Sequence, residues 1–214
     1  MHIQQNIIDC YNLTAKQYAK QYADELRNKH LDRLLLQSFA AENKHRGKTI
    51  DLGCGPGQTT KFLYDNGQQN ILGTDLSPEM IATAKNSYPG IEFDTADMLN
   101  LQYADGSFGS ATAFYSIVHF TEEQVQTAFR EVFRVLTSNS PFLFSFHIGT
   151  EKIHVDRFLE QDVNIDFYFF ETEKILKLVT ETGFTIQEVI ERQPYPDAEH
   201  HTKRAYITAA KNNH

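Results

Sequence analysis

Composition and charge narrow what this chain can be: 41% of its 214 residues are hydrophobic, and 28 acidic against 20 basic residues give a formal net charge of −8 at pH 7. Because nucleic-acid binding depends mainly on basic surface that neutralises phosphates, this balance argues against a nucleic-acid partner. No stretch approaches about 18 apolar residues, no secretory signal pattern opens the chain, and two cysteines make no disulfide framework, so we expect a cytoplasmic protein without a membrane partner.

The first part of the chain is predicted to be helical over residues 6–45. It has few helix breakers, and its apolar residues recur three and four positions apart, as in "LDRLLLQSFAAE". We interpret residues 1–46 as a helical cap or lid that forms one compact unit with a domain over residues 47–214.

Strand-like and helix-like stretches then alternate from residue 48 to residue 149. Ser77 and Thr121 are expected to cap helices, and strands are expected at "KTIDLG", "NILGTDL", "IEFDTAD", "GSATAFYSIVHF" and "SPFLFSFHIG". This alternation is typical of an α/β protein with a parallel sheet and helices on both faces.

The last third of the chain departs from that alternation. Residues 150–170 are interpreted as an irregular aromatic segment, of which some phenylalanines could wall a pocket. A helix is expected over "ETEKILKLVTETG", ending at Gly183. The stretches "FTIQEVIER" and "KRAYITAAK" follow with no helix between them, so we expect them to pair as antiparallel strands.

The stretch "TIDLGCGPGQTT" joins a strand to three glycines at alternate positions, Gly53, Gly55 and Gly57. Glycine lets the backbone turn sharply and lets a ligand approach it closely. The turn after the first strand is also where doubly wound folds bind nucleotides. The dinucleotide fingerprint G-x-G-x-x-G fails here, because Gln58 or Thr60 stands where its third glycine would fall. This argues against a nicotinamide oxidoreductase.

Acids at the ends of three successive strands indicate the ligand that this loop would meet. Asp75 ends the second strand, where a carboxylate can accept both hydrogen bonds of a ribose diol. Asp97 ends the third strand and could bind an adenine amino group, while Asp51 ends the first and could meet an ammonium group. S-adenosylmethionine has a ribose, an adenine and a cationic end, and it is the obvious candidate.

Taken together, these motifs resemble the class I S-adenosylmethionine-dependent methyltransferases over residues 48–211. The resemblance is carried by "DLGCGPG", "GTDLSPEM", "ADMLNL", "AFYSIVHF" and "REVFRVL". It implies a Rossmann-like, doubly wound, seven-stranded sheet that is mostly parallel with an antiparallel last strand, with S-adenosylmethionine as cofactor and S-adenosylhomocysteine as product. One departure is Gly109, where the family usually begins its fourth strand with an acid.

The resemblance also implies a set of site residues. The glycine loop and Asp51 would line the methionine part of the cofactor, and Tyr11 and Tyr18 would face it from the N-terminal helix, although these two could instead form a core stripe. The expected cofactor-binding residues are Tyr11, Tyr18, Asp51, Gly53, Gly55, Gly57, Asp75, Leu76, Met80, Asp97, Met98 and Tyr115.

The acceptor side is predicted to be lined by Tyr115, His119 and His147, which are the candidate catalytic residues. Each histidine could act as a general base or could only hydrogen-bond a neighbouring element. No metal site is expected, because the adjacent residues of "AEHHTK" would point opposite ways on an extended segment.

We therefore expect an enzyme that methylates a small-molecule N, O, S or C nucleophile, as a monomer or a homodimer. An RNA or protein methyltransferase and a non-catalytic S-adenosylmethionine-binding module stay open as alternatives.

Overall fold

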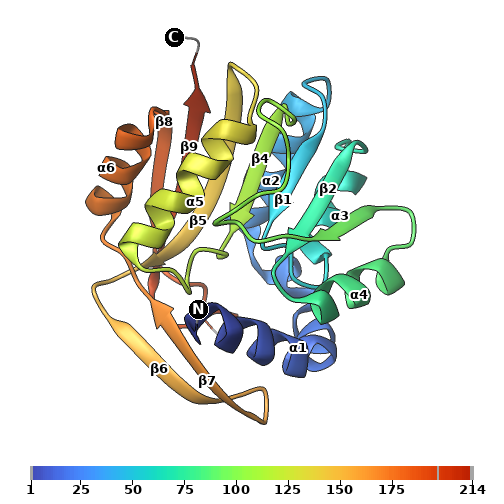
Figure 1. Cartoon of the computed structure of the whole chain (residues 1–214), viewed down its shortest axis with the longest axis vertical. Coiled ribbons are helices and arrows are strands. Elements are labelled where there is room, and N and C mark those ends of the chain that lie inside the picture. Colours follow the sequence, from blue (N-terminus) through green and yellow to red (C-terminus); the bar gives the residue numbers. More distant parts are fainter. Residues whose placement is uncertain (1, 197, 213–214) are drawn as a thin grey trace.

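A seven-stranded sheet forms the centre of the computed structural model, which describes residues 2–196 and 198–212 (Figure 1). Its strands lie in the order β3 (Glu92–Thr95), β2 (Ile71–Asp75), β1 (Thr49–Leu52), β4 (Ser110–Phe114), β5 (Ser140–Ile148), β9 (Lys203–Lys211) and β8 (Thr185–Arg192). Strands β1 to β5 pair in parallel, whereas β9 pairs antiparallel with both β5 and β8. The predicted α/β, Rossmann-like sheet with an antiparallel last strand is confirmed.

Helices cover both faces of this sheet, and β5 shows how its residues divide between them. Leu143 packs in a cluster with residues of α2 (His30–Asn43) and α3 (Gln58–Asp65). Its neighbours Phe142 and Phe144 pack instead with α5 (Glu122–Val135) and α6 (Thr172–Thr182). Successive side chains of a strand point to opposite faces, so this strand, which is apolar on both sides, is buried between two helical layers.

Two helices begin where their capping residues predict. The Ser77 hydroxyl accepts a hydrogen bond from the amide of Met80 at the start of α4 (Pro78–Ser87). At the start of α5, the Thr121 hydroxyl accepts from the Gln124 amide while the Gln124 side chain accepts from the Thr121 amide, which makes a capping box.

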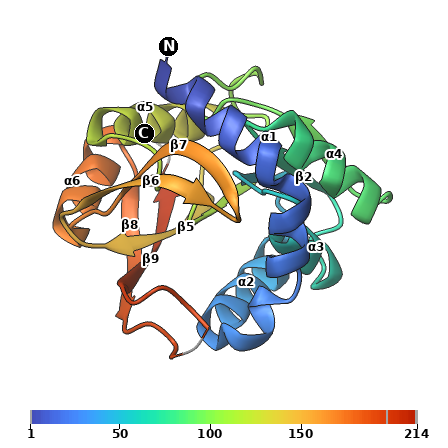
Figure 2. The same cartoon turned by 90° about the horizontal axis from the view of Figure 1, so that it is seen from below.

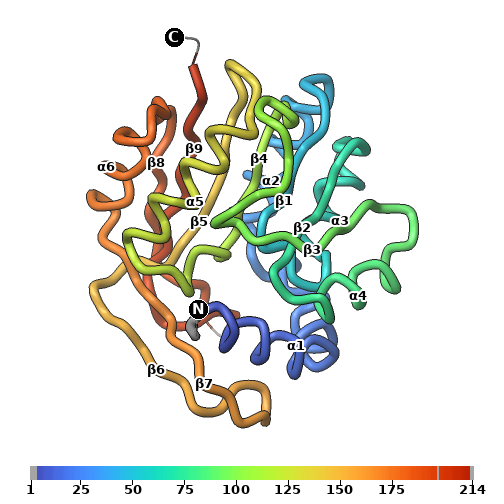
Figure 3. Tube along the Cα trace, in the orientation of Figure 1, coloured from blue at the N-terminus to red at the C-terminus, as the bar shows by residue number. Residues whose placement is uncertain are grey.

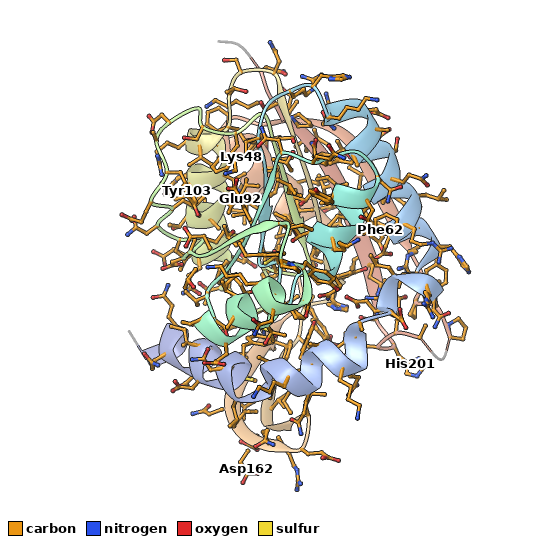
Figure 4. All side chains as sticks on the ribbon, turned by 90° about the vertical axis from the view of Figure 1, so that its right-hand side faces the viewer. Lys48, Phe62, Glu92, Tyr103, Asp162 and His201 are labelled. Carbon is orange, nitrogen blue, oxygen red and sulfur yellow. The ribbon has the colours of Figure 1, made fainter. Side chains whose placement is uncertain are left out.

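The carboxyl edge of the sheet is covered by two elements from distant parts of the chain, α1 (His2–Tyr22) and the hairpin of β6 (Lys152–Phe158) and β7 (Gln161–Tyr168) (Figure 2). Ile7 and Cys10 of α1 pack against Ile165 of β7 in one apolar cluster. The trace in Figure 3 shows both elements meeting below the sheet. In Figure 4, Asp162 marks the lower end of the hairpin, beyond α1.

The hairpin corrects the prediction of an irregular segment over residues 150–170. Strands β6 and β7 pair antiparallel and are joined by two residues, Leu159 and Glu160, both with positive φ angles of 47° and 64°. Such turns usually carry asparagine, aspartate or glycine, because these residues tolerate positive φ at low cost. Without a turn residue of this kind, the sequence gives no hairpin signal between the two strands.

The N-terminal helical region is interrupted where the sequence predicts one continuous helical stretch. A short 3-10 helix (Glu25–Asn28) separates α1 from α2. Leu36, Phe39 and Ala40 of α2 are buried against the sheet, whereas α1 lies at its edge. The division into residues 1–46 and 47–214 stays a prediction. Among the described residues, no helix is long and apolar enough to cross a membrane.

Gly109, the departure from the family pattern, lies just before β4. A Cβ atom at this position would lie 1.6 Å from the carbonyl oxygen of Arg46. The Gly109 amide also donates to the carbonyl of Lys48 at 2.9 Å. The backbone leading into β1 therefore occupies the space that a side chain would need, and an acid does not fit here.

Candidate functional site

A cavity of about 480 Å³ lies at the carboxyl ends of the strands. The ends of β1, β2, β4 and β5 form its floor, α1 and the β6–β7 hairpin form its outer wall, and the segment before β9 closes one end. Its place agrees with the crevice in which open α/β sheets bind ligands.

One side of the cavity brings together most of the residues that the sequence assigns to the adenosyl ligand. They come from the β1–α3 loop, the end of β2, the start of α4 and the loop after β3, and they are Gly53, Gly55, Asp75, Leu76, Met80, Asp97 and Met98.

Asp75 holds the glycine loop against the end of β2. One carboxylate oxygen accepts a hydrogen bond from the Gly55 amide at 2.9 Å, and the other accepts from the Ser77 amide at 2.8 Å. Burial raises the pKa of Asp75, while these backbone hydrogen bonds act in the opposite direction. Each carboxylate oxygen keeps a further lone pair for a ligand, because a carboxylate offers about four acceptor sites.

Asp97 connects the loop after β3 to the covering helix. Its carboxylate accepts from the Leu99 amide at 2.9 Å and from the side-chain amide of Gln4 at 2.8 Å. Because Gln4 lies near the start of α1, this contact holds the N-terminal helix over this side of the cavity. No sequence motif singles out Gln4.

Asp51 lies beneath the glycine loop. Its carboxylate is buried and accepts hydrogen bonds from the hydroxyls of Thr60 at 2.6 Å and Thr112 at 2.7 Å. It is not among the residues that line the cavity. Burial raises the pKa of Asp51 to about 6. This acid therefore ties β1 to α3 and β4, and its contact with a methionine end stays a prediction.

Gly57 also lies outside the cavity lining, and its predicted role at the cofactor stays a prediction. It begins α3 with a φ of 90°, and a Cβ at this position would lie 2.8 Å from the ring of Phe93. The first two glycines face the cavity, whereas Gly57 allows the chain to turn into the helix and to pack on β3.

Two features of the loop fit a polar ligand that approaches the backbone. The Ser116 hydroxyl oxygen is buried in the cavity wall and has no hydrogen-bond partner within residues 2–196 and 198–212. A Cβ on Gly53 would lie 2.3 Å from the Ser116 Cβ, whereas a Cβ on Gly55 would meet no atom within 4 Å. The loop is thus packed at Gly53 against the segment that follows β4 and is open at Gly55, and an unsatisfied polar group lies nearby. These residues fit the amino-acid end of S-adenosylmethionine.

Tyr11 and His119 form a hydrogen-bonded pair in the cavity wall. The Tyr11 hydroxyl lies 2.7 Å from Nε2 of His119, and Nδ1 of His119 lies 2.8 Å from the carbonyl oxygen of Asp166. A carbonyl oxygen only accepts, so Nδ1 carries the proton and the Tyr11 hydroxyl donates to Nε2. Burial lowers the pKa of His119 to about 4 and raises the pKa of Tyr11, so both groups are neutral at pH 7.

Aromatic rings surround this pair. Tyr18 packs edge-on against Tyr11 with ring centres 6.1 Å apart, and Phe158 of the hairpin packs edge-on against Tyr11 at 6.3 Å. Phe167 packs against the His119 ring at 4.6 Å. The hairpin therefore supplies part of the cavity wall. Two phenylalanines of "IDFYFF", Phe167 and Phe169, line the cavity.

Tyr115 and His147 lie at the other end of the cavity. The Tyr115 hydroxyl donates to or accepts from the Tyr206 hydroxyl at 2.8 Å and lies 3.2 Å from a carboxylate oxygen of Asp32. Tyr115 has a positive φ of 53°, an uncommon conformation for a residue with a side chain. Its ring centre is 5.2 Å from that of His147, whose pKa burial lowers to about 3 with help from nearby positive charges.

Several residues of this end carry no motif in the sequence. Lys29 and Arg204 line the cavity beside Tyr115 and His147. Arg192 forms ion pairs with Asp32 and Glu199 at 3.0 and 2.7 Å. Because Glu199 is held by Arg192, the geometry gives it no role in a metal site. Among the described residues, no group of three or more histidine, cysteine or acidic side chains could hold a metal ion.

Part of the chain is similar to known methyltransferases. Residues 50–139 match the family model of a methyltransferase domain. The trans-aconitate 2-methyltransferase of Methylobacterium nodulans is 40% identical over 88 residues, which cover 41% of this chain and 32% of that protein. An uncharacterized methyltransferase of Bacillus subtilis, YcgJ, is 29% identical over 146 residues, which cover 66% of this chain and 56% of that protein.

The solved structures agree on the fold. The crystal structure of a SAM-dependent methyltransferase from Methanosarcina mazei matches with a TM-score of 0.71 at 16% identity, covering 81% of this chain and 96% of that one. At this identity the likeness shows the fold alone. The chain spans about half or less of the length of the two curated relatives.

Proposed function

We propose that this chain, which contains a class I S-adenosylmethionine-dependent methyltransferase domain, moves the methyl group of S-adenosylmethionine to a small-molecule N, O, S or C nucleophile. The observation that carries the proposal is the single cavity shared by two sets of groups. Asp75 and Asp97 lie on its adenosyl side, and the Tyr11–His119 pair lies in the same cavity. Methyl transfer gains mainly from alignment of donor and acceptor, and one shared cavity supports that alignment.

The covered shape of the cavity favours a small acceptor. Its volume of about 480 Å³ lies in the range of small-molecule pockets, and α1 and the β6–β7 hairpin cover the carboxyl edge of the sheet. An RNA acceptor would also meet a chain with a net charge of −8. The relative from Methylobacterium nodulans is named for trans-aconitate, a small organic acid, which supports an acceptor of this size class.

Different residues would bind the cofactor and accept the proton. When bound, S-adenosylmethionine supplies a methyl group activated by a sulfonium. Asp75 would accept the ribose hydroxyls and Asp97 the adenine amino group, so both fix the direction in which the methyl group points. A neutral His119 can take up a proton, and its Nε2 is reached through the Tyr11 hydroxyl. The acceptor's proton would therefore pass to Tyr11 as the Tyr11 proton moves to His119.

Titration with S-adenosylhomocysteine tests the adenosyl site. We expect Asp75→Ala to weaken binding by about 1–3 kcal/mol, because a ligand hydroxyl loses its acceptor and the Gly55 amide loses its partner. Asp105→Ala is the matched control, since the Asp105 side chain is 81% exposed and does not line the cavity. Equal affinities of the two variants would remove Asp75 from the site, and binding of NAD in place of S-adenosylhomocysteine would overturn the assignment of the ligand.

Labelled S-adenosylmethionine separates an enzyme from a binding module. Incubation with fractions of a cell metabolite extract should transfer label to a low-molecular-weight product. Label found only in RNA or protein fractions would replace the small-molecule acceptor by a macromolecular one, and no transfer in any fraction would favour a non-catalytic module. A cytoplasmic location and a monomeric or homodimeric state belong to the same proposal.

A further inference from the structure

The end of the cavity away from the Tyr11–His119 pair contains two cationic side chains. Lys29 lies between the 3-10 helix and α2, and Arg204 lies near the start of β9. Both line the cavity, beside His147 at the end of β5 and His200 in the segment before β9. We call the part of the cavity around Lys29 and Arg204 the cationic end of the cavity.

Arg204 is deeply buried, yet its guanidinium is only partly satisfied. The residue is 2% exposed. Its Nη1 donates to the carbonyl oxygens of His200, at 2.7 Å, and of Thr202. Its Nε is buried and has no hydrogen-bond partner within residues 2–196 and 198–212, and no hydrogen bond of its Nη2 is found there either. A buried guanidinium with idle donors is costly unless a ligand completes it.

The nearest acid does not complete Arg204, because it is already engaged. Both carboxylate oxygens of Glu199 accept from Arg192, at 2.7 and 2.8 Å, and one also accepts from the Tyr195 amide. Nε of Arg204 lies 3.4 Å from Glu199 but is not aligned for a hydrogen bond. Arg192 is shared in turn with Asp32. Glu199 therefore forms an ion pair with Arg204, but its oxygens take their hydrogen bonds from Arg192 and Tyr195, and Arg204 keeps donors without a hydrogen-bond partner among the described residues.

Lys29 adds a second cation at this end. Its Nζ pairs with Glu25 at 2.6 Å and lies 5.0 Å above the Tyr115 ring, with a side chain 13% exposed. An ammonium has three donors, and a single ion pair leaves donors for a ligand. The pKa of His147 agrees with this charge distribution. Burial lowers that pKa most, and Arg204, His200 and Lys29 lower it further, whereas Glu199 raises it.

We propose that the cationic end of the cavity binds an oxyanion, a carboxylate or a phosphate, carried by the methyl acceptor. The inference rests on the proposed function and narrows its substrate class. No hydrogen bond of Arg204 Nη2 is found among the described residues, and a single ion pair leaves donors on Lys29 Nζ. An oxyanion can accept charge-assisted hydrogen bonds from both cations. An acceptor held in this way extends from Arg204 toward the adenosyl side of the same cavity.

Calorimetry with two simple anions tests the inference. Succinate and inorganic phosphate are titrated separately into the protein, alone and saturated with S-adenosylhomocysteine, at constant ionic strength set with sodium chloride. We expect at least one of them to bind with a dissociation constant in the millimolar range or tighter. Binding of succinate alone assigns a carboxylate, and binding of phosphate alone assigns a phosphate.

Charge-removing variants identify the residues. Arg204→Gln should weaken the bound anion at least tenfold, and Lys29→Gln at least threefold. Lys177→Gln removes the same charge from α6, where the side chain is 74% exposed, and should leave the affinity unchanged. Because Arg204 also holds the segment before β9, S-adenosylhomocysteine affinity serves as the check that each variant folds, and Lys29→Gln gives the same answer from another element.

Two results would overturn the inference. One is that neither anion binds to either form of the protein. The other is that Arg204→Gln and Lys29→Gln, both folded, bind the anion as the unchanged chain does. Failure of S-adenosylhomocysteine to bind would count against the proposed function instead, and the titrations of the protein alone would still decide the anion site.

Discussion

Replacement of Tyr11 by phenylalanine isolates the hydrogen bond between the Tyr11 hydroxyl and His119. The change removes one oxygen and keeps the ring, so the edge-on packing with Tyr18 and Phe158 stays in place. What is lost is the donor that lies 2.7 Å from Nε2 of His119 and stabilises the neutral imidazole. Nδ1 keeps its own partner, the carbonyl of Asp166.

The size of the effect follows from that one bond. A neutral hydrogen bond contributes about 0.5–1.5 kcal/mol net, and one pKa unit corresponds to about 1.4 kcal/mol. We therefore expect Tyr11→Phe to raise the pKa of His119 from about 4 by roughly half a unit to one unit. A loss of about 1 kcal/mol in the free energy of unfolding would lower the melting temperature by about 2–4 °C in a chain of this size.

Nuclear magnetic resonance of the histidine ring, together with thermal unfolding, measures both effects. Nitrogen-15 spectra at pH 7 should show the proton on Nδ1 in the original chain and in Tyr11→Phe. Tyr103→Phe is the control, because its hydroxyl bonds Asp94 at 3.3 Å on the surface, outside the cavity. A proton found on Nε2, or a pKa of His119 that does not rise in Tyr11→Phe, would refute the assigned pair.

Two further predictions concern stability. Gly109→Ala should lower the free energy of unfolding by about 1–3 kcal/mol, because the added Cβ would meet the backbone of Arg46. Gly90→Ala is the control, because its added Cβ would meet no atom within 4 Å, and it should leave the free energy of unfolding unchanged. Equal melting temperatures of the two variants would contradict the prediction. Between pH 7 and pH 5, His119 and His147 take up protons in the unfolded chain but not in the folded chain, where their pKa values are about 4 and 3. Asp51 acts in the opposite direction, because its pKa of about 6 in the folded chain lets it take up a proton only when folded. The two histidines outweigh the acid, so urea unfolding should show a net loss of roughly 2–3 kcal/mol on acidification, and a gain would show that the histidines are not buried as neutral rings.

Local patterns were enough to predict that four of the candidate site residues lie together. Gly53, Gly55, Asp75 and Asp97 lie within one stretch of alternating strands and helices, and the carboxyl ends of parallel strands meet at one edge of a sheet. Spacing along the chain therefore translates directly into neighbourhood in space. The sequence does not show that Asp51 is buried beneath the loop, because the direction of its side chain depends on Thr112, its partner in the register of β4.

The acceptor side of the cavity could be predicted from the sequence only in part. Tyr11, His119 and His147 were singled out one by one, but their residue types do not say which of them touch. The hydrogen bond between Tyr11 and His119 joins positions 108 residues apart. Arg204 belongs to no sequence motif. The donors of the Arg204 guanidinium that lack a partner are seen only in the tertiary structure, where Glu199 is hydrogen-bonded to Arg192.

The sequence by itself determined the fold class, the methyltransferase resemblance and the turn of the glycine loop, because glycines, capping residues and periodicity act over a few neighbouring residues. The tertiary structure alone decided that the β6–β7 hairpin closes the cavity with α1, that Asp51 is buried against Thr60 and outside the cavity lining, and that Lys29 and Arg204 line the far end. Those features arise from contacts between distant segments, and whether a charge is free depends on every partner that folding brings to it.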